Sequence, residues 1–384
     1  MSALAGRNQE DYLIELTSAA IGQREAAKNA GRLNWGWIYK MSDYHHVANL
    51  VYYKIMWEDD PDIRPWKDKF QTRYRKAIRV QEICGELRTD LEKRLENAGV
   101  HSLFAGESAI LGFYPQAEMR MPEPIQILIQ KKHMNDVRRI ISEMGFEEES
   151  ARDGVHTWRS LQSGELSVSV AEAFPFTGRK IRKWFAEFPK NLPREDGRHY
   201  IHYMNEDTLY IYFICRLAEK YARGQIEIRD IVDLWLLISR EGPALRWKEI
   251  MEELESMELE TFGEYITKLA GKWFANMYFR EDMDMLRDMQ DYIFSKGEEA
   301  RRENEAILPL VRTVADNYYR DLKKEEKAKL RSWRFPSLEY MATPYPILSK
   351  LPFLLPFCWI LRIIKQKRFS RKEREKEENQ AEEP

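Results

Sequence analysis

The sequence predicts an α+β fold in which a small mixed sheet, flanked by helices, lies between helical N-terminal and C-terminal regions. Apolar residues recur at helical spacing before residue 100 and again after residue 206, whereas the intervening stretch contains short β-prone runs. The 384 residues are 43% hydrophobic and 12% aromatic, which is enough for a large packed core. A wholly disordered chain is therefore excluded.

The first hundred residues are expected to be helical. Apolar side chains over residues 43–53 follow helical spacing, with Ser42 as the expected N-cap. A longer helix is expected between residues 71 and 97, and Gly99 should end it in the left-handed conformation. Its predicted buried stripe has a residue at every fourth position: Ile83, Leu87, Leu91 and Leu95.

The pattern changes at about Val100, where the sheet is expected to begin. Four β-prone runs predict strands, near residues 100–104, 125–129, 156–161 and 166–174. The second of these has isoleucine at every second position, which predicts one apolar face. Ser163-Gly164 predicts a hairpin turn between the last two strands. A helical stripe over residues 137–144, closed by Gly145, is expected to cover the sheet.

Helices are expected again from Glu206 to about residue 330. The first should begin after Asn205 as N-cap and end at Gly224. The next two are expected over residues 228–239 and 247–257. These patterns divide the chain into five parts: residues 1–99, 100–190, 191–340, a Pro-rich apolar segment over 341–364, and a charged, disordered tail over 365–384.

Charge and cysteine content narrow the classes of function. The 61 lysines and arginines balance 63 aspartates and glutamates, a formal net charge of −2, which argues against a nucleic-acid partner. The three cysteines lie far apart, so no disulfide framework or cysteine-rich zinc site is expected. The first residues lack the features of a signal peptide, and a cytoplasmic protein is expected.

Residues 347–364 form the most apolar stretch, but Lys350, Pro352, Pro356 and Arg362 interrupt it, so we do not expect it to span a membrane. Packing against the protein as a C-terminal clamp is the favoured interpretation. The alternative is a peripheral membrane protein, because basic residues follow this apolar stretch and an anionic membrane surface attracts them.

Several motifs follow one another in a recognisable order. They are Trp37 with residues 43–53, Phe104-Ala105-Gly106, Tyr114-Pro115, Arg120, residues 125–129, residues 228–237 with Arg229, Asp230 and Asp233, and the closing pairs Phe335-Pro336, Tyr345-Pro346, Leu351-Pro352 and Leu355-Pro356. This order resembles the uncharacterised nucleotidyltransferase family, a branch of the polymerase-β-like nucleotidyltransferase superfamily. The resemblance implies a nucleotidyltransferase-like sheet over residues 100–190.

The resemblance also implies a chemistry. Members of the superfamily transfer a nucleotide to an acceptor, using two Mg²⁺ ions held by an Asp-x-Asp pair on a strand and a third carboxylate on a neighbouring strand. A spacing of two places both carboxylates on one face of the strand. Mg²⁺ and a nucleoside triphosphate are thus the implied cofactors of an active member. Gly106, Ser108 and Arg120 are the implied nucleotide-binding residues.

The sequence departs from that pattern at the metal positions. Pro124 and Gln126 stand where the Asp-x-Asp pair is expected, and the third carboxylate position falls at Ser167 or Ser169. Ala105 stands where a lysine usually precedes the glycine. The leading hypothesis is therefore a catalytically degenerate protein that binds a nucleotide or acts as a scaffold for a protein or small-molecule partner.

A second hypothesis keeps the enzyme active through relocated acids, transferring a nucleotide to a small molecule, sugar or peptide. Glu165 shares a strand face with Ser167, and Glu107 adjoins Gly106. Both would have to approach one metal position, within about 4–6 Å. Either alternative requires backbone rearrangement, because a shift of one residue reverses the direction of a side chain on a strand.

The remaining motif residues have structural interpretations as well. Gly106 is either a turn glycine or part of a phosphate cradle, and Arg120 is either a solvated loop residue or a phosphate contact. Arg229, Asp230 and Asp233 lie near the start of a helix, where we expect a structural salt bridge first and acceptor binding second. No metal site is predicted from the scattered histidines.

Overall fold

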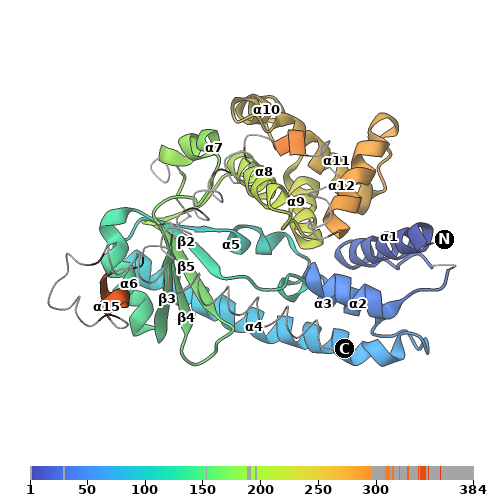
Figure 1. The fold of residues 1–384 in the computed structure, drawn as a ribbon, viewed down its shortest axis with the longest axis horizontal. Helices are drawn as coiled ribbons and strands as arrows, with labels where there is room; N and C mark the ends of the chain where they lie inside the picture. Colours follow the sequence, from blue (N-terminus) through green and yellow to red (C-terminus); the bar gives the residue numbers. More distant parts are fainter. Residues whose placement is uncertain are drawn as a thin grey trace, which may run out of the picture. The chain divides into compact units, whose positions relative to one another are not determined.

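Helices flank a six-stranded mixed sheet in the computed structural model, which confirms the predicted α+β fold (Figure 1). The structure describes residues 2–28, 31–152, 154–187, 192–194 and 197–295, with single residues and short stretches between 308 and 355. The chain divides into two compact units, Met1–Asn317 and Tyr318–Pro384. The first unit contains the sheet and all the sites described below.

The second unit contributes the short helix α15 (Leu338–Ala342), in which Met341 is buried. The predicted tail over residues 365–384 lies outside the described residues, as does the apolar stretch over 347–364 apart from Leu355. Among the described residues, no helix combines the length and the apolarity needed to cross a bilayer.

The N-terminal region is helical, as predicted, but the prediction of one of its helices is wrong. Its helices are α1 (Ser2–Ile21), α2 (Trp35–Tyr44), α3 (Ala48–Ile55) and α4 (Arg64–Asn97). The helix expected over residues 43–53 is divided between α2 and α3, and Ser42 is buried inside α2 instead of capping a helix. The chain turns at His46, with φ +56°. The neighbouring His45 ring packs edge-on against Phe294 and accepts a hydrogen bond from the Ile228 N–H (3.3 Å), contacts that a continuous helix does not provide.

Helix α4 covers one face of the sheet. Leu91 and Leu95 are fully buried in the sheet core, whereas Ile83 is 38% exposed, so the predicted stripe is buried only in its C-terminal part. Gly99 follows α4 with φ +69°, the predicted left-handed conformation. Helix α6 (Met134–Glu143) packs into the same core beside α4.

The sheet has the strand order β3-β4-β5-β2-β1-β6. Its strands are β1 (Ser102–Ala105), β2 (Ile125–Ile129), β3 (Phe146–Arg152), β4 (Val155–Ser160), β5 (Ser167–Ala171) and β6 (Ile201–His202). β2 pairs with β5, and β1 with β6, in parallel, and the other pairs are antiparallel. β3 and β6 were not predicted, because β3 is a largely exposed acidic run without alternation and β6 has only two residues.

The two faces of the central strands differ in character. Ile125, Ile127 and Ile129 of β2 point into the core with α4 and α6, as their spacing predicts. Gln126 lies on the opposite face, and Ser169 of β5 is its direct partner in the parallel register. The pairing therefore places two neutral polar side chains next to each other on the sheet face away from α4.

Helices from the second half of the chain gather on that other side of the sheet (Figure 1). They are α7 (Arg179–Trp184), α8 (Glu206–Ala222), α9 (Ile228–Glu241), α10 (Trp247–Ser256), α11 (Glu260–Ala275) and α12 (Met283–Phe294). Asn205 caps α8, as predicted, by accepting a hydrogen bond from the Thr208 N–H (3.0 Å). The short helix α5 (Glu107–Ile110) connects β1 to the loop that leads to β2.

Candidate functional site

A cavity of about 260 Å³ opens between the sheet and α8. Its walls come from five parts of the fold, namely β2, β4, β5, the segment Phe174-Pro175-Phe176, and α8. The volume is near the lower end of the range for small-molecule pockets. The cavity lies on the sheet face that carries Gln126, and its lining does not include Gly106 or Arg120, two of the residues that the resemblance implies for nucleotide binding.

The sheet wall of the cavity is neutral. Gln126 and Ser169 both line it, and they are register partners on adjacent parallel strands. Ser167 lies two residues earlier on the same face of β5, and Pro124 is exposed just before β2. Of these four predicted metal positions, Gln126 and Ser169 line the wall, and none of the four side chains carries a charge.

The turn after β1 is closed by the protein's own side chains. Gly106 has φ +64°, and a Cβ added there would lie 3.0 Å from both Cδ and Oε1 of Gln126, so only glycine fits this turn without strain. Gln126 therefore covers the turn.

Three cations from α8 line the opposite wall. Arg216, Lys220 and Arg223 follow one another at spacings of four and three, which places them on one face of the helix. Each has an acidic partner: Arg216 bonds Glu123 at 2.9 Å, Lys220 bonds Asp230 at 2.7 Å, and Arg223 bonds Glu219 at 2.9 Å. This row was not predicted, although two cations of α8 and a third at its C-cap, Arg223, are visible at helical spacing in the sequence.

Glu219 attaches the aromatic wall to α8. Its carboxylate accepts hydrogen bonds from the Thr177 N–H (2.8 Å), the Thr177 hydroxyl (2.6 Å) and the Gly178 N–H (3.0 Å). The residues just before them, Phe174 and Phe176, stack with ring centroids 5.6 Å apart. The aromatic side of the cavity is therefore held in place by one buried carboxylate.

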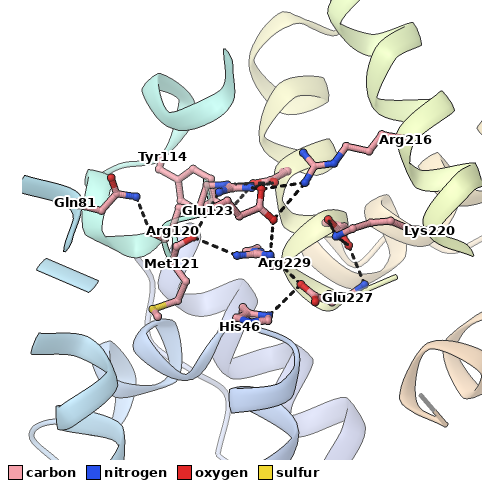
Figure 2. Close-up of polar contacts among 12 residues, drawn as sticks. His46, Gln81, Tyr114, Arg120, Met121, Glu123, Arg216, Lys220, Glu227 and Arg229 are labelled. Atoms are coloured by element: carbon pink, nitrogen blue, oxygen red, sulfur yellow. Dashed lines mark hydrogen bonds and ion pairs between the residues drawn. The ribbon is translucent and has the colours of Figure 1, made fainter. Parts of the chain in front are cut away.

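Behind the cationic wall, Glu123 is the centre of a buried ion-pair network (Figure 2). Its carboxylate accepts hydrogen bonds from Arg120 (3.2 Å), Arg216 (2.9 Å) and Arg229 (2.6 Å). Burial opposes ionisation of Glu123, but the guanidinium groups of Arg216, Arg229 and Arg120 outweigh it and hold its pKa well below the ordinary value. Glu123 is therefore a carboxylate that links the loop before β2 to α8 and α9.

Arg120 is completely buried, so it is not a solvated loop residue. Its guanidinium donates three hydrogen bonds to Asp233 of α9, at 3.0, 3.2 and 2.8 Å, and the Tyr114 hydroxyl donates a fourth at 2.7 Å. The Gln81 side chain of α4 donates to the Arg120 carbonyl (2.9 Å). These contacts give Arg120 a structural role between α4 and α9, beside the network in Figure 2.

The other helix-motif residues also form buried ion pairs. Arg229 bonds Glu123, and Asp230 accepts hydrogen bonds from Lys220 and from the Glu227 N–H (2.9 Å), which forms a capping box at the start of α9. Glu227 in turn lies 3.1 Å from His46. Although burial opposes its ionisation, His46 and Arg229 lower the pKa of Glu227 to about 2.

Of the two acids suggested as replacements, Glu165 lies away from the cavity. Glu165 pairs with Lys76 (3.1 Å) and Arg79 (2.5 Å) of α4, which covers the opposite face of the sheet from the cavity. Its hydrogen bond to Lys76 lowers its pKa below the ordinary value. The side chains of Glu107 and Ser108 lie outside the described part of the chain.

The residues at the cavity do not fit a pair of magnesium ions. Mg²⁺ prefers anionic oxygen ligands in octahedral geometry, and Gln126 and Ser169 offer only neutral oxygens. The three cations of α8 line the same space and would repel a metal ion. Among the described residues, no group of three or more His, Cys, Asp or Glu side chains is arranged to hold a metal.

Comparison with known families agrees with the placement of these elements. A family model described as "Uncharacterised nucleotidyltransferase" matches residues 31–275. The matched region includes the complete sheet, the cavity and the ion-pair network around Glu123. No curated protein and no solved structure matches the chain.

Proposed function

We propose, because the chain belongs to the uncharacterised nucleotidyltransferase family, that it is a non-catalytic member which binds a nucleotide in the cavity between the sheet and α8. It would then act as a nucleotide-dependent binding or scaffolding partner of another protein. The observation that carries this proposal is the neutral pair formed by Gln126 and Ser169, at the position where a catalytic member needs carboxylates.

The loss of these charges bears directly on catalysis. Nucleotidyl transfer develops negative charge on phosphate oxygens, and catalytic members of the superfamily stabilise it with metal ions held by carboxylates. The residues present do not supply that set of ligands, so the transfer step loses its main source of charge stabilisation.

The cavity nevertheless has features that a nucleotide needs. Phe174, Phe176 and Tyr212 offer aromatic surface for a base or ribose, and cations of α8 lie next to them. The ion-pair network behind the wall fixes α8 and α9 relative to the loop before β2. Because these elements are fixed, the pocket can bind a ligand without a change in the positions of α8 and α9. Such a preformed site is expected for a scaffold.

Calorimetry with a parallel transfer assay tests the proposal. The full chain is titrated with Mg-ATP and the other Mg-nucleoside triphosphates, and the same samples are assayed for pyrophosphate release with candidate acceptors. We expect saturable binding of at least one nucleotide without pyrophosphate release above a protein-free blank.

The variant Glu165→Ala distinguishes an active enzyme with relocated acids from the proposed non-catalytic protein. Glu149→Ala is its matched control, because Glu149 is an exposed acid of β3 that pairs only with Arg159 among the contacts described. Metal-dependent turnover that disappears in Glu165→Ala but persists in Glu149→Ala would overturn the non-catalytic assignment.

A further inference from the structure

The row of cations on α8 indicates how the phosphates of the ligand are recognised, which goes beyond the proposal that a nucleotide binds. We infer that the cavity binds the phosphates of its ligand without a divalent metal ion, and that Arg216, Lys220 and Arg223 supply the positive charge. This inference rests on the proposed function, since it takes the same cavity as the ligand site.

The geometry places the three side chains on one wall. Around a helix, the residue four positions on lies about 40° to one side and the residue seven positions on about 20° to the other, so the three residues span about 60°. Arg216, Lys220 and Arg223 all line the cavity, and Figure 2 shows Arg216 and Lys220 extending from the same helix. A chain of two or three phosphates has enough oxygens to contact several cations arranged along a helix in this way.

The acids that pair with these cations leave hydrogen-bonding capacity unused. Arg216 donates to Glu123 through Nη2, while its buried Nη1 has no hydrogen-bond partner among the described residues. Lys220 donates to both oxygens of Asp230, and an ammonium group carries three N–H bonds. A buried donor without a partner is costly, so a ligand oxygen that reaches Arg216 gains a bond which the protein alone does not satisfy.

Glu219, the acid on the cavity wall, already accepts hydrogen bonds from the protein. Glu219 lines the cavity, but its oxygens accept hydrogen bonds from Thr177, Gly178 and Arg223. Its charge is therefore compensated locally, and it does not oppose an anionic ligand as strongly as a bare carboxylate would. Glu123 and Asp230 lie behind the cations and are buried with them.

The neutral sheet wall completes the argument. A wall with three carboxylates repels a triphosphate, and metal ions are needed between them to make binding favourable. With Gln126 and Ser169 in those places, the repulsion is absent, and their side chains can donate hydrogen bonds to phosphate oxygens. The same substitutions that remove the metal ligands thus make a metal unnecessary for binding.

Calorimetric titration of the full chain with ATP, once in excess EDTA and once in excess Mg²⁺, tests this inference. We expect ATP to bind in EDTA with an affinity at least equal to that in Mg²⁺, because the free nucleotide carries more negative charge. We also expect the affinity to fall as the salt concentration rises. Tripolyphosphate and adenosine, titrated separately in EDTA, distinguish recognition of phosphate from recognition of the nucleoside.

The variant Arg223→Gln is expected to weaken binding of ATP in EDTA about tenfold, the effect of one charge-assisted hydrogen bond. Arg223 is 30% exposed, so the variant should fold, which a thermal melt checks. Lys183→Gln is the matched control, because Lys183 is an exposed cation of α7 outside the cavity wall. The affinity of this variant for ATP in EDTA should equal that of the native chain.

The outcomes separate this inference from the proposed function. Binding of ATP in Mg²⁺ but not in EDTA would overturn metal-free recognition and leave nucleotide binding in place. Binding of tripolyphosphate in EDTA without binding of ATP would support the cationic wall and overturn the nucleotide assignment. Equal loss of affinity in Arg223→Gln and Lys183→Gln would contradict the role of the α8 row.

Discussion

At the scale of single residues, Glu123 links three parts of the fold through ion pairs. It is buried among three guanidinium groups that come from the loop before β2, from α8 and from α9. Removing one partner from such a group leaves buried charges uncompensated, which costs more than the intact network contributes. The side chain therefore matters for stability although it takes no part in the cavity wall.

We predict that Glu123→Gln lowers the free energy of unfolding by about 3–5 kcal/mol. Urea denaturation followed by far-ultraviolet circular dichroism measures the change. Glu165→Gln is the control, because Glu165 pairs with Lys76 and Arg79 at the protein surface, and loss of a surface pair costs at most about 1 kcal/mol. Equal effects of the two substitutions would contradict the central position of Glu123.

The same residue predicts a dependence of stability on pH. The pKa of Glu123 in the folded protein is lowered below 4.5, and that of Glu227 is lowered to about 2, so the unfolded chain binds more protons as the pH falls through this range. Their contribution to stability is complete above about pH 4.5 and is lost progressively below it. Urea denaturation between pH 2.5 and 6 should show this decline, and Glu123→Gln should have a shallower decline than the native chain.

The residue pattern predicts some of these roles but not all of them. Alternation along a strand is local, so it predicts that Gln126 points away from the isoleucine face of β2, whereas its pairing with Ser169 depends on the register between two strands. The burial of Arg120 could not be predicted, because its partner Asp233 is 113 residues away in the chain and only the fold brings the two together. Glu123 has the same long-range dependence, with partners in α8 and α9.

At the scale of elements, the segment with Phe174 and Phe176 depends on its attachment to α8. Both backbone N–H groups of Thr177 and Gly178 donate to Glu219, which is itself 5% exposed. Without this acceptor, the segment loses three hydrogen bonds at once and the aromatic wall loses its support.

We predict that Glu219→Ala increases hydrogen exchange at the Thr177 and Gly178 amides by about tenfold or more, because each amide loses the partner that protects it. Hydrogen–deuterium exchange followed by mass spectrometry measures this change. Glu249→Ala on the exposed side of α10 is the control and should leave the exchange of this segment unchanged. Unchanged exchange in Glu219→Ala would show that other contacts hold the segment.

Helices and strands in which apolar residues recur at regular spacing could be predicted from sequence. Elements without such spacing could not. β2 and α8 to α10 begin or end within about two residues of the predicted limits, because apolar spacing and capping residues mark them. The break between α2 and α3 was missed, since apolar spacing continues through it. It depends on contacts of His45 with Phe294 and Ile228, far along the chain.

At the scale of the whole chain, the first unit combines the α+β fold of the nucleotidyltransferase family with a cavity whose sheet wall is neutral. The family match over residues 31–275 covers the sheet. The apolar core of the sheet and the ion-pair network include neither Gln126 nor Ser169. Neutral residues at these two positions are therefore compatible with an intact fold.

Titration with Mn²⁺, followed by electron paramagnetic resonance of the free ion, tests the central claim most directly. The double variant Gln126→Asp/Ser169→Asp places two carboxylates next to each other on paired strands. It is compared with the native chain under the same conditions. We predict that the native chain leaves Mn²⁺ free at millimolar concentrations, and that the double variant binds it more tightly. Stoichiometric binding of Mn²⁺ by the native chain, abolished by Gln126→Ala, would contradict the account.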